Sequence, residues 1–496
     1  MTEKLNKTIL FITPPYHAGV VEVAGRWVPL YFVYLAAAAR EAGLTPVVYD
    51  AMTKGVTHAE IEEKIKEVKP DYVATGAITC TLPDAIKVLE TAKKVHPDAK
   101  TLLGGIHPTF MFEEVFGLTS AVDFIVRGEG EITLKELLIA LDTEGADLKE
   151  VKGIAYKKGD ELIVTPEREL MECVELDKLS KAWDVLDWDD YHYFILPGSK
   201  LGALDTSRGC DKECTFCSQR KFWRESWRPR DPEKLIEDIE EQKRYGVDVV
   251  LLTDDYPTQD RQRWERFLDL LIEREVNVYI LMETRVEDIV RDADILEKYR
   301  RAGVIHIYVG IEASDQSTID LFKKDIKVED AKKALELLDE HGIITETSMI
   351  LGLPEDTKES IEKTLQLSME YSPDFCHFLA LAPWPYADMY PDLKPYIKVD
   401  DYKHYNLIDP IIEPKNMTLA EVDEAIVDCY RRFYMGKLKE VVAITDTFKR
   451  DYMLEAMRRI MRDSFLINKL GDLGQIPDEV EKQMSVLSAP HKKVAG

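Results

Sequence analysis

The sequence predicts an α/β protein made of two successive series of alternating strands and helices, followed by a mostly helical C-terminal region. Two stretches predict the alternation, because short apolar runs alternate with amphipathic segments over residues 1–145 and again over residues 201–395. A third observation separates them, since residues 146–200 interrupt the alternation and residues 396–496 show none. We therefore expect two α/β domains, a linker between them and a C-terminal helical region, with these boundaries.

The first series has the order of a parallel sheet that is covered by helices on both faces. Strands are expected at residues 8–12, 46–50, 71–76, 101–105 and 123–128, with helices at 30–42, 59–68, 83–96 and 132–141. Ligands bind such sheets at the carboxyl ends of the strands. The loops there are 13–19, 76–82, 104–109 and 128–131, and their glycines let a backbone approach a flat ligand closely. The plainer interpretation is that they are ordinary turns of a flavodoxin-like domain.

The second series predicts a parallel partial barrel of six strands. Strands are expected at residues 201–206, 249–253, 278–282, 306–311, 345–351 and 375–381, with helices at 232–245, 259–273, 293–302, 328–341 and 358–371. Catalytic groups of such barrels gather at the carboxyl ends of the strands. We therefore expect the functional residues of this domain in the loops that follow its strands.

The two remaining regions give weaker signals. Lys158-Gly159-Asp160 predicts the turn of a β-hairpin within the linker. In the C-terminal region, helices are expected at 419–434 and 450–465, with Gly436 between them, and the aromatic residues at helical spacing favour core packing. The tail 485–496 is small and polar, so we expect it to be loose.

Three of the seven cysteines, Cys210, Cys214 and Cys217, fall within eight positions directly after the first predicted barrel strand. The spacing C-x-x-x-C-x-x-C on one loop suits three irons of a [4Fe–4S] cluster and leaves the fourth iron open to a small molecule. A zinc site would normally need a fourth Cys or His nearby, and none occurs in the next twenty residues. A cluster is therefore favoured over zinc, and zinc over a chance arrangement.

This spacing, with the aromatic Phe216 directly before the last cysteine, resembles the radical S-adenosylmethionine (radical SAM) superfamily. The resemblance implies that Cys210, Cys214 and Cys217 hold the cluster and that Phe216 belongs to the cofactor site. It also implies that the amino and carboxylate groups of SAM chelate the open iron. One electron from the cluster then cleaves SAM to methionine and a 5′-deoxyadenosyl radical, which takes a hydrogen atom from an unactivated carbon.

Polar residues follow the second and third predicted barrel strands, beside the expected cluster. Thr253, Asp254 and Asp255 offer carboxylate and backbone groups for the ammonium group of SAM. The plainer interpretation of these residues, a solvated acidic turn, is weaker at this position. Glu283 and Arg285 end the third strand, where an arginine suits the SAM carboxylate.

The next two barrel strands also end in candidate residues. Glu312 and Ser314 end the fourth strand, where the resemblance implies binding of ribose hydroxyl groups. Residues 348–355 end the fifth strand and resemble the G-x-I-x-G-x-x-E stretch of the family, with Ser348 in place of the first glycine. The resemblance implies that Gly352 of this stretch packs near the adenine.

The runs 104–109 and 127–131, ahead of the cysteine motif, resemble the cobalamin-binding domain of the cobalamin-dependent radical SAM family. The resemblance implies a flavodoxin-like (Rossmann-type) cobalamin-binding domain followed by a partial (β/α)6 barrel radical SAM domain. The implied cobalamin-binding residues are Pro14, Gly76, Thr79, Gly104, Gly105, His107, Gly128, Glu129 and Gly130.

The D-x-H-x-x-G signature that supplies a histidine to cobalt in other cobalamin proteins is absent. Many members of the family also lack it. The lower cobalt ligand is then water or a side chain of loop 76–82. His17 and His107 are more simply explained as histidines whose hydrogen bonds are satisfied within the fold.

The composition excludes several classes of function. The chain has 496 residues and a net charge of −27 at pH 7, which argues against a nucleic-acid-binding protein, because such a protein needs a basic surface. No apolar run has the length of a membrane span. The polar start shows no signal peptide, and the few further cysteines fit a reducing cytoplasm, so a cytoplasmic location is expected.

The resemblance implies a cobalamin-dependent radical SAM methyltransferase that methylates an unactivated carbon with methylcobalamin, and an external electron donor. The turn 253–258 and the stretch 402–405 resemble a branch of the family that contains the anaerobic magnesium-protoporphyrin monomethyl ester cyclase. The same branch includes an archaeal enzyme that methylates the α-carbon of a glutamine in methyl-coenzyme M reductase.

The compact C-terminal region and the acidic composition favour the protein methyltransferase, and thus a post-translational modification of a protein or peptide substrate. Two alternatives stay open. One is a cyclase-like radical enzyme acting on a tetrapyrrole, which would use the same cofactors without methyl transfer. The other is a non-catalytic carrier of cobalamin or iron–sulfur, which would produce no 5′-deoxyadenosine.

Overall fold

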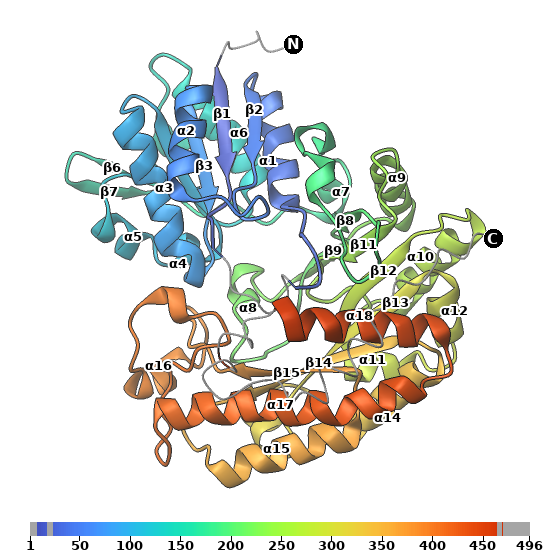
Figure 1. Ribbon diagram of the computed structural model, residues 1–496. Helices are drawn as coiled ribbons and strands as arrows, with labels where there is room; N and C mark the ends of the chain where they lie inside the picture. The colour runs from blue at the N-terminus through green and yellow to red at the C-terminus, as the bar shows by residue number, and fades with distance from the viewer. Residues whose placement is uncertain (1–6, 17–22, 464–468, 470–496) are drawn as a thin grey trace.

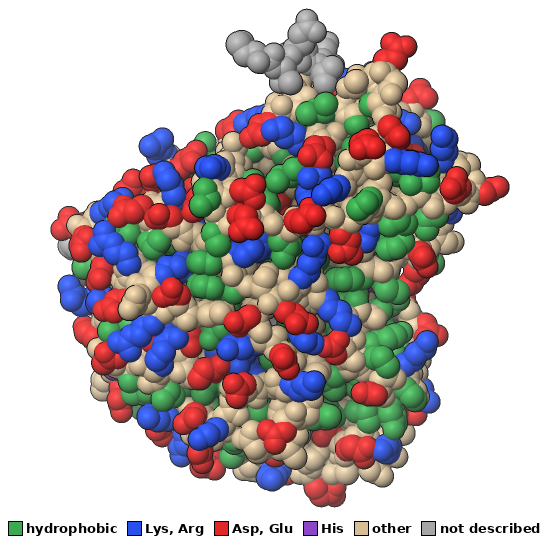
Figure 2. Space-filling view, turned by 180° about the vertical axis from the view of Figure 1, so that it is seen from behind, with side chains coloured by type: hydrophobic (Ala, Val, Ile, Leu, Met, Phe, Trp, Pro, Cys, Tyr) green, Lys and Arg blue, Asp and Glu red, His purple; other side chains and the backbone are tan. Residues whose placement is uncertain are grey.

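The computed structural model describes residues 7–16, 23–463 and 469 (Figure 1). Two separate sheets form its framework, one in the N-terminal domain and one in the barrel. The predicted α/β class, with a helical C-terminal region, is confirmed. No helix of these described residues is long and apolar enough to cross a membrane. On the face shown in Figure 2, acidic and basic side chains are interspersed.

The first sheet has the strand order β2-β1-β3-β4-β5-β6-β7, and β1 to β5 run parallel. Apolar side chains on its two faces form two separate cores, because helices cover both sides. Its parallel strands are β1 (Thr8–Ile12), β2 (Thr45–Tyr49), β3 (Tyr72–Gly76), β4 (Lys100–Gly104) and β5 (Phe124–Val126). Its helices are α1 (Leu30–Glu41), α2 (His58–Val68), α3 (Leu82–Val95), α4 (Ile106–Phe110), α5 (Phe112–Leu118) and α6 (Gly130–Leu141).

The predicted hairpin forms, but it belongs to the first sheet. Strand β6 (Ile154–Lys158) pairs antiparallel with β5, and β7 (Glu161–Val164) pairs antiparallel with β6. The sheet gains this edge because Ile154, Ala155 and Tyr156 bury their side chains against the helices of the N-terminal domain. The part of the 146–200 stretch that acts as a connector therefore begins after β7 and contains the short helix α7 (Cys173–Leu176).

The second sheet is the predicted parallel partial barrel of six strands, in the order β15-β14-β13-β12-β11-β8. Its strands are β8 (Leu201–Leu204), β11 (Val249–Leu252), β12 (Tyr279–Arg285), β13 (Val304–Glu312), β14 (Ile344–Leu351) and β15 (Phe375–Ala380). Its helices are α9 (Pro232–Lys243), α10 (Arg261–Glu273), α11 (Val286–Arg291), α12 (Leu296–Arg301), α13 (Gln316–Leu321), α14 (Val328–Glu340) and α15 (Lys358–Tyr371).

A small feature of the barrel was not predicted. Strands β9 (Ser207–Gly209) and β10 (Trp227–Pro229) form an antiparallel pair after β8, and the cysteine loop and α8 (Gln219–Phe222) lie between them. Three-residue strands give too little alternation to be recognised in a sequence. This pair fixes both ends of the cysteine loop.

The predicted break at Gly436 is wrong. Helix α17 runs without interruption from Leu419 to Ala443, after α16 (Tyr390–Leu393) and before α18 (Thr447–Asp463). Glycine in a helix interior costs only about 1 kcal/mol, and burial of side chains such as Phe433 against Phe378 of β15 offsets that cost. The aromatic residues of α17 are core, as predicted. The tail 485–496 lies outside the described residues.

Figure 1 shows how the parts meet. The N-terminal domain lies against the end of the barrel at which the cysteine loop is found, and α17 and α18 run along the barrel beneath it. The carboxyl ends of both sets of strands, and so the two predicted cofactor sites, belong to this shared region.

Candidate active site

The cysteine loop is held by backbone contacts on both sides. Thr215 N donates to Phe322 O at 2.9 Å, and Met389 N donates to Thr215 O at 3.1 Å. Phe216 packs edge-on against the ring of Phe322, with ring centroids 4.9 Å apart, and this contact also holds the loop in place. Gly209 begins the loop at φ +88°, where a Cβ would lie 2.2 Å from Ser226 O. The loop therefore needs glycine at its start.

The donor set suits an iron–sulfur cluster. Burial raises the pKa of the Cys210 thiol to about 11 and that of Cys217 to about 12, so without iron these thiols hold their protons, and coordination must release them. No group of three or more His, Cys, Asp or Glu side chains in the described part of the chain is arranged to hold a single metal ion. A [4Fe–4S] cluster does not require that arrangement, because each thiolate binds a different iron.

The two carboxyl groups of the predicted acidic turn after β11, Asp254 and Asp255, have different surroundings. Asp254 is buried and accepts hydrogen bonds from Thr206 N at 2.8 Å, Thr206 Oγ1 at 2.7 Å and Ser207 Oγ at 2.6 Å. Its carboxylate therefore fixes the strand before the cysteine loop and has little left for a ligand. Burial and the neighbouring Asp254 raise the pKa of Asp255 to about 7. A cationic ligand would relieve this repulsion.

Glu283, at the end of β12, belongs to the same acidic group. Desolvation, together with the nearby carboxyls of Asp255, Asp254 and Glu312, raises the pKa of Glu283 to about 8. Thr253 and Glu283 both line a cavity inside the barrel mouth. The arrangement therefore presents two carboxyl groups, Asp255 and Glu283, that are poised for a positively charged partner.

Arg285 provides the opposite charge. Its guanidinium lies over the ring of Tyr256, 5.7 Å from the centroid, and it pairs with Glu287. Its Nη2 atom is buried and has no hydrogen-bond partner. Since the thiol of Cys214 is close enough to influence the pKa of Arg285, this free donor lies beside the cysteine loop, as an arginine for the SAM carboxylate would.

The remaining SAM candidates have partners within the fold. Glu312 Oε1 lies 2.9 Å from Lys324 Nζ, and Ser348 Oγ donates to Glu312 Oε2 at 3.0 Å. Ser314 Oγ lies 3.0 Å from Thr364 Oγ1. Gly352 has φ +84°, and its N–H donates to Asp356 at 2.9 Å. Glu312 ends β13 and Ser314 lies two residues beyond it, but their ribose-binding role stays a prediction.

The carboxyl edge of the first sheet is formed mainly by backbone. Gly76 pairs with Gly104 at the ends of β3 and β4. At Gly105, φ is +101° and a Cβ would lie 2.4 Å from Ala77 O, so only glycine fits. Gly128 N donates to Thr109 Oγ1 at 3.0 Å, which brings the third loop to the same edge. The structure thus brings the predicted glycine loops together.

Two large, mainly apolar side chains at this edge are exposed to solvent. Tyr31 is 48% exposed and Ile78 is 51% exposed. Such surface is costly to leave in water, and a large ligand that approaches the glycine backbone would cover it. Pro14 follows β1 and accepts through its carbonyl from Tyr16 N at 2.8 Å. The edge therefore fits a flat macrocycle such as cobalamin.

His107 is fully buried at the same edge. Its Nδ1 atom lies 3.1 Å from Thr79 Oγ1, and Thr79 Oγ1 lies 3.0 Å from the hydroxyl of Tyr386, which follows β15. Burial lowers the pKa of His107 to about 4, so the ring is neutral. The Nε2 atom has no hydrogen-bond partner, so His107 is only half satisfied within the fold. His17 lies outside the described residues.

Glu129 has a structural partner that sequence reasoning did not predict. Its carboxylate accepts from Arg208 Nη1 at 3.0 Å and from Arg228 Nη1 at 2.9 Å, and Met171 N donates to it at 2.9 Å. Both arginines lie in the short β9–β10 pair of the barrel domain. Glu129 therefore joins the N-terminal domain to the strands that carry the cysteine loop, and Gly130 begins α6 beside it.

The two edges enclose a cavity of about 660 Å³. Ile78 and Cys80 of the first domain, Thr253 and Glu283 of the barrel, and Tyr452 of α18 all line it. Most of the lining is apolar. Its size and lining are typical of a site for a ligand larger than a single amino acid.

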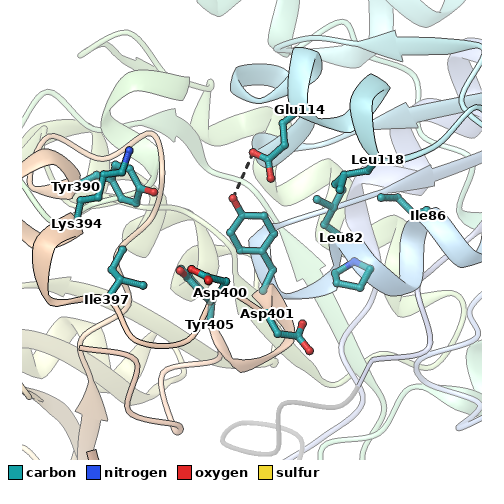
Figure 3. A pocket seen from close by; sticks show the side chains of 12 residues that line it. Leu82, Ile86, Glu114, Leu118, Tyr390, Lys394, Ile397, Asp400, Asp401 and Tyr405 are labelled. Carbon is teal, nitrogen blue, oxygen red and sulfur yellow. Dashed lines mark hydrogen bonds between the residues drawn. The ribbon is translucent and has the colours of Figure 1, made fainter. Parts of the chain in front are cut away.

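A second cavity, also of about 660 Å³, lies between α3 and α5 of the N-terminal domain and the segment 390–405 (Figure 3). The hydroxyl of Tyr402 donates to Glu114 across it at 3.3 Å. Tyr402 also packs against His107, with ring centroids 5.0 Å apart. The stretch 402–405 therefore contacts the predicted cobalamin domain, although it lies far away in the sequence.

Sequence reasoning missed the polar residues inside the barrel. His306 of β13, Glu346 of β14 and His377 of β15 lie together and line the first cavity. Each is a polar residue on the inward face of its strand, where side chains alternate between the two faces. This signal becomes specific only when the three strands are seen side by side.

Comparison with protein families supports the same division of the chain. Residues 16–138 match the B12 binding domain, and residues 204–368 match the radical SAM superfamily. The anaerobic magnesium-protoporphyrin IX monomethyl ester cyclase of Rubrivivax gelatinosus is 38% identical over 475 residues, which are 94% of this chain and 84% of that protein. An uncharacterised methyltransferase of Pyrococcus horikoshii is 28% identical over 461 residues, covering 92% of this chain and 98% of that protein.

Among solved structures, the radical SAM methyltransferase TsrM from Kitasatospora setae, with cobalamin and a [4Fe–4S] cluster bound, superposes with a TM-score of 0.65. It is 17% identical, and the match covers 78% of each chain, so it supports the fold. Together with the donor set and the glycine edge, these matches make this chain a member of the cobalamin-dependent radical SAM family that includes the anaerobic magnesium-protoporphyrin IX monomethyl ester cyclases, with a [4Fe–4S] cluster, SAM and cobalamin as its cofactors.

Proposed function

We propose that this enzyme carries out cyclase-like radical chemistry on a carbon of a tetrapyrrole. The observation that carries the proposal is the similarity to a magnesium-protoporphyrin ester cyclase over almost the whole chain. It extends beyond the cofactor domains into the regions that enclose the 660 Å³ cavity. A large cavity with a mainly apolar lining and a few polar groups suits a flat macrocycle better than it suits an extended polar peptide.

The residues of this chain have separable roles in that chemistry. Cys210, Cys214 and Cys217 would hold the cluster, while Asp255 and Arg285 would bind the ammonium and carboxylate groups of SAM. When bound, the cluster supplies the electron that cleaves SAM and yields the 5′-deoxyadenosyl radical. An external electron donor returns that electron. The apolar walls of the cavity exclude water from the substrate radical.

Methyl transfer to carbon is the second candidate. The Pyrococcus relative is named a methyltransferase, and the structural neighbour TsrM is one. Both candidates use the same cofactors and the same residues. The narrower prediction of a glutamine methyltransferase for methyl-coenzyme M reductase finds no support in these relatives and stays a prediction.

The test uses enzyme that has been reconstituted with iron, sulfide and cobalamin. It is incubated under anaerobic conditions with a reductant, SAM carrying a deuterated methyl group, and magnesium-protoporphyrin IX monomethyl ester. Mass spectrometry then follows 5′-deoxyadenosine and the tetrapyrrole. We expect tetrapyrrole-dependent formation of 5′-deoxyadenosine and a product without the deuterated methyl group.

A deuterated methyl group in the product would favour the second candidate over ring closure. Formation of 5′-deoxyadenosine that does not respond to the tetrapyrrole would contradict both. The glutamine-containing peptide of methyl-coenzyme M reductase is tested in a parallel reaction, in which methylated peptide would restore the narrower prediction.

A further inference from the structure

A chain of hydrogen bonds leads from the apolar cavity into the wall of the barrel. Tyr308 of β13 lines the cavity, and its hydroxyl contacts Ser348 Oγ on the neighbouring strand β14. Ser348 Oγ donates to Glu312 Oε2 at 3.0 Å, and Glu312 Oε1 lies 2.9 Å from Lys324 Nζ. Lys324 in turn lines a polar surface depression of about 650 Å³. The chain therefore joins the apolar cavity to a polar one.

The backbone of β13 is shaped to complete this chain. Its pairing with β14 shifts register between Gly310 and Glu312, and Glu312 has φ +71°, which is uncommon for a residue other than glycine. Such an irregularity re-aims a side chain, and backbone of this kind is found often at functional sites. A Cβ at residue 310 would lie 2.7 Å from Lys324 Nζ, so glycine there leaves room for the ion pair.

Ser348 is the central link. It occupies the first glycine position of the G-x-I-x-G-x-x-E stretch that the sequence resembles. A glycine would offer no hydroxyl, and Tyr308 would then have no connection to Glu312. The Ser348 side chain is fully buried, and within the described chain its hydroxyl has these two hydrogen-bond partners. The departure from the family's stretch therefore creates the chain.

The hydrogen bonds point outward from the cavity. Glu312, in its ion pair with Lys324, accepts the proton of Ser348. A serine hydroxyl has one proton, so Ser348 must accept from Tyr308. The Tyr308 oxygen makes no other hydrogen bond to the residues that the structure describes, so it can still accept from a partner in the cavity.

The charged neighbours of Tyr308 keep its phenol neutral. Glu312 of the same strand, Glu283 of β12 and Glu346 of β14 lie near it, and burial together with these carboxyls raises the pKa of Tyr308 well above its ordinary value. A neutral phenol that cannot hold a negative charge takes up a proton only while it releases its own. Tyr308 is therefore suited to pass a proton along the chain.

We propose that Tyr308 accepts a proton that the substrate loses during ring closure, and that Ser348 and Glu312 carry this proton away from the cavity. The inference rests on the proposed function and deepens it, because it adds a catalytic residue. Formation of a carbon–carbon bond between two C–H groups removes two hydrogens. The 5′-deoxyadenosyl radical takes the first as a hydrogen atom, and the resulting carbon radical bonds to the second carbon.

The second carbon then loses its hydrogen as a proton to the Tyr308 oxygen, and one electron passes to the oxidised iron–sulfur cluster, which is a one-electron acceptor. Tyr308 gives its own proton to Ser348, and Ser348 gives its proton to Glu312. Both hydroxyls thereby end with one proton each, as they began, and the negative charge of Glu312 is neutralised.

The test is a single turnover of the reconstituted enzyme with SAM, a reductant and magnesium-protoporphyrin IX monomethyl ester. Tyr308→Phe keeps the aromatic ring and removes the acceptor, and Ser348→Ala breaks the chain at its centre. Because abstraction of the hydrogen atom precedes loss of the proton, 5′-deoxyadenosine should form at the parent rate in both variants. The ring-closed product should form about 100-fold more slowly.

The pH profile separates a relay from a merely structural role. Without the relay, water or hydroxide must take the proton, so the residual ring closure of both variants should rise with pH more steeply than that of the parent. Ser348→Thr keeps a hydroxyl and should recover ring closure. Iron content and tetrapyrrole affinity should equal those of the parent. If Ser348→Ala fails to fold, Ser348→Gly, which restores the residue of the family's stretch, makes the same test.

Two control variants remove buried or half-buried hydroxyls outside the chain. Ser368 and Tyr371 both lie on α15, and their hydroxyls donate to the backbone carbonyls of Thr364 and Val328. Ser368→Ala and Tyr371→Phe should therefore match the parent in both products and in the pH profile.

The outcomes distinguish this inference from the proposed function. Ring closure at the parent rate in Tyr308→Phe and Ser348→Ala would show that the relay is wrong while the proposed function stands. Weaker tetrapyrrole binding with the parent's pH profile would also overturn it, since Tyr308 would then only shape the cavity. If the parent forms no 5′-deoxyadenosine in response to the tetrapyrrole, the proposed function fails as well. Normal formation of 5′-deoxyadenosine with slow, pH-dependent ring closure supports the relay.

Discussion

The two carboxyl edges that face each other in this molecule have opposite chemistry. The edge of the N-terminal sheet is built from glycine backbone, open apolar side chains and one buried neutral histidine, His107. The edge of the barrel carries carboxyls with raised pKa values, at Asp255 and Glu283, and a partly free arginine, Arg285. Both are strand ends of parallel sheets, where sites are expected.

The comparison shows that the topology of a parallel sheet determines where a site lies, whereas the side chains at that edge determine which ligand it can bind. A backbone-lined edge suits a large macrocycle that is held by contact area. An edge with closely spaced charges of both signs suits a small zwitterion such as SAM. Glu129 joins the two edges through Arg208 and Arg228, so their separation is fixed by buried ion pairs.

The largest effect is expected from Cys217→Ala, which removes one iron ligand. We expect loss of the cluster and a fall of more than roughly 100-fold in 5′-deoxyadenosine formation, since even outer partners of metal ligands cost 10–100-fold. Cobalamin binding should persist, because the other edge holds it. Iron and cobalamin analyses measure both. Cys173→Ala, on α7 outside the cysteine loop, is the control, and full iron content in Cys217→Ala would contradict the assignment.

The next largest effect is expected from Glu129→Gln, which leaves Arg208 and Arg228 without their shared carboxylate. Breaking a buried ion pair costs about 3–5 kcal/mol, so the free energy of unfolding should fall by that amount. Chemical denaturation of the cluster-loaded enzyme measures it. Glu136→Gln is the matched control, because Glu136 pairs with Arg168 while it is 44% exposed. Equal effects of the two changes would show that the domain contact is weak.

Glu283→Gln tests whether ionisation of the acidic group at the barrel edge destabilises the folded protein. The pKa of Glu283 is raised to about 8 from an ordinary value of about 4.5. The folded state therefore binds the proton more tightly than the unfolded state, and stability falls as pH rises through that window. Because the Glu283 side chain is open to the cavity and water screens its charge, we expect it to account for a loss of at most about 2 kcal/mol between pH 6 and pH 8.

Denaturation of the SAM-free enzyme across this pH range checks the prediction. In Glu283→Gln the stability should depend less on pH, while the parent should recover stability at pH 8 when SAM is added. Glu233→Gln is a control, since Glu233 is surface-exposed and paired with Arg266 and Arg274. An unchanged pH profile in Glu283→Gln would show that its carboxyl ionises normally.

The smallest effect is expected from Gly105→Ala at the other edge. The added Cβ would lie 2.4 Å from Ala77 O, at φ +101°, and we expect a cost of about 1–3 kcal/mol in stability. Cobalamin binding should weaken while the iron content is unchanged. Gly117→Ala, which has open space around its Cβ, is the control. Loss of iron instead of cobalamin would reverse the assignment of the two edges.

Much of the fold and part of the candidate site could be predicted from the sequence. The series of strands and helices was predicted almost element by element, because apolar periodicity is a local property of the chain. The cysteine motif predicted the iron ligands, since three thiols on one loop are close in space whatever the rest of the fold does. The sequence predicted the position of the turn after β11, but it could not show that Asp254 of this turn accepts hydrogen bonds from Thr206 and Ser207.

What the sequence alone determined is therefore local, namely the two α/β domains, the glycine edge and the iron–sulfur loop. Only the tertiary structure decided which groups are free to act. Glu129 forms an ion pair with Arg228, and Glu312 forms one with Lys324. In contrast, the Nη2 atom of Arg285 has no hydrogen-bond partner. The tertiary structure also assembled His306, Glu346 and His377 from three strands. The physical reason is that hydrogen bonds and charge pairs depend on distances of a few ångströms between residues far apart in the chain, which no local pattern encodes.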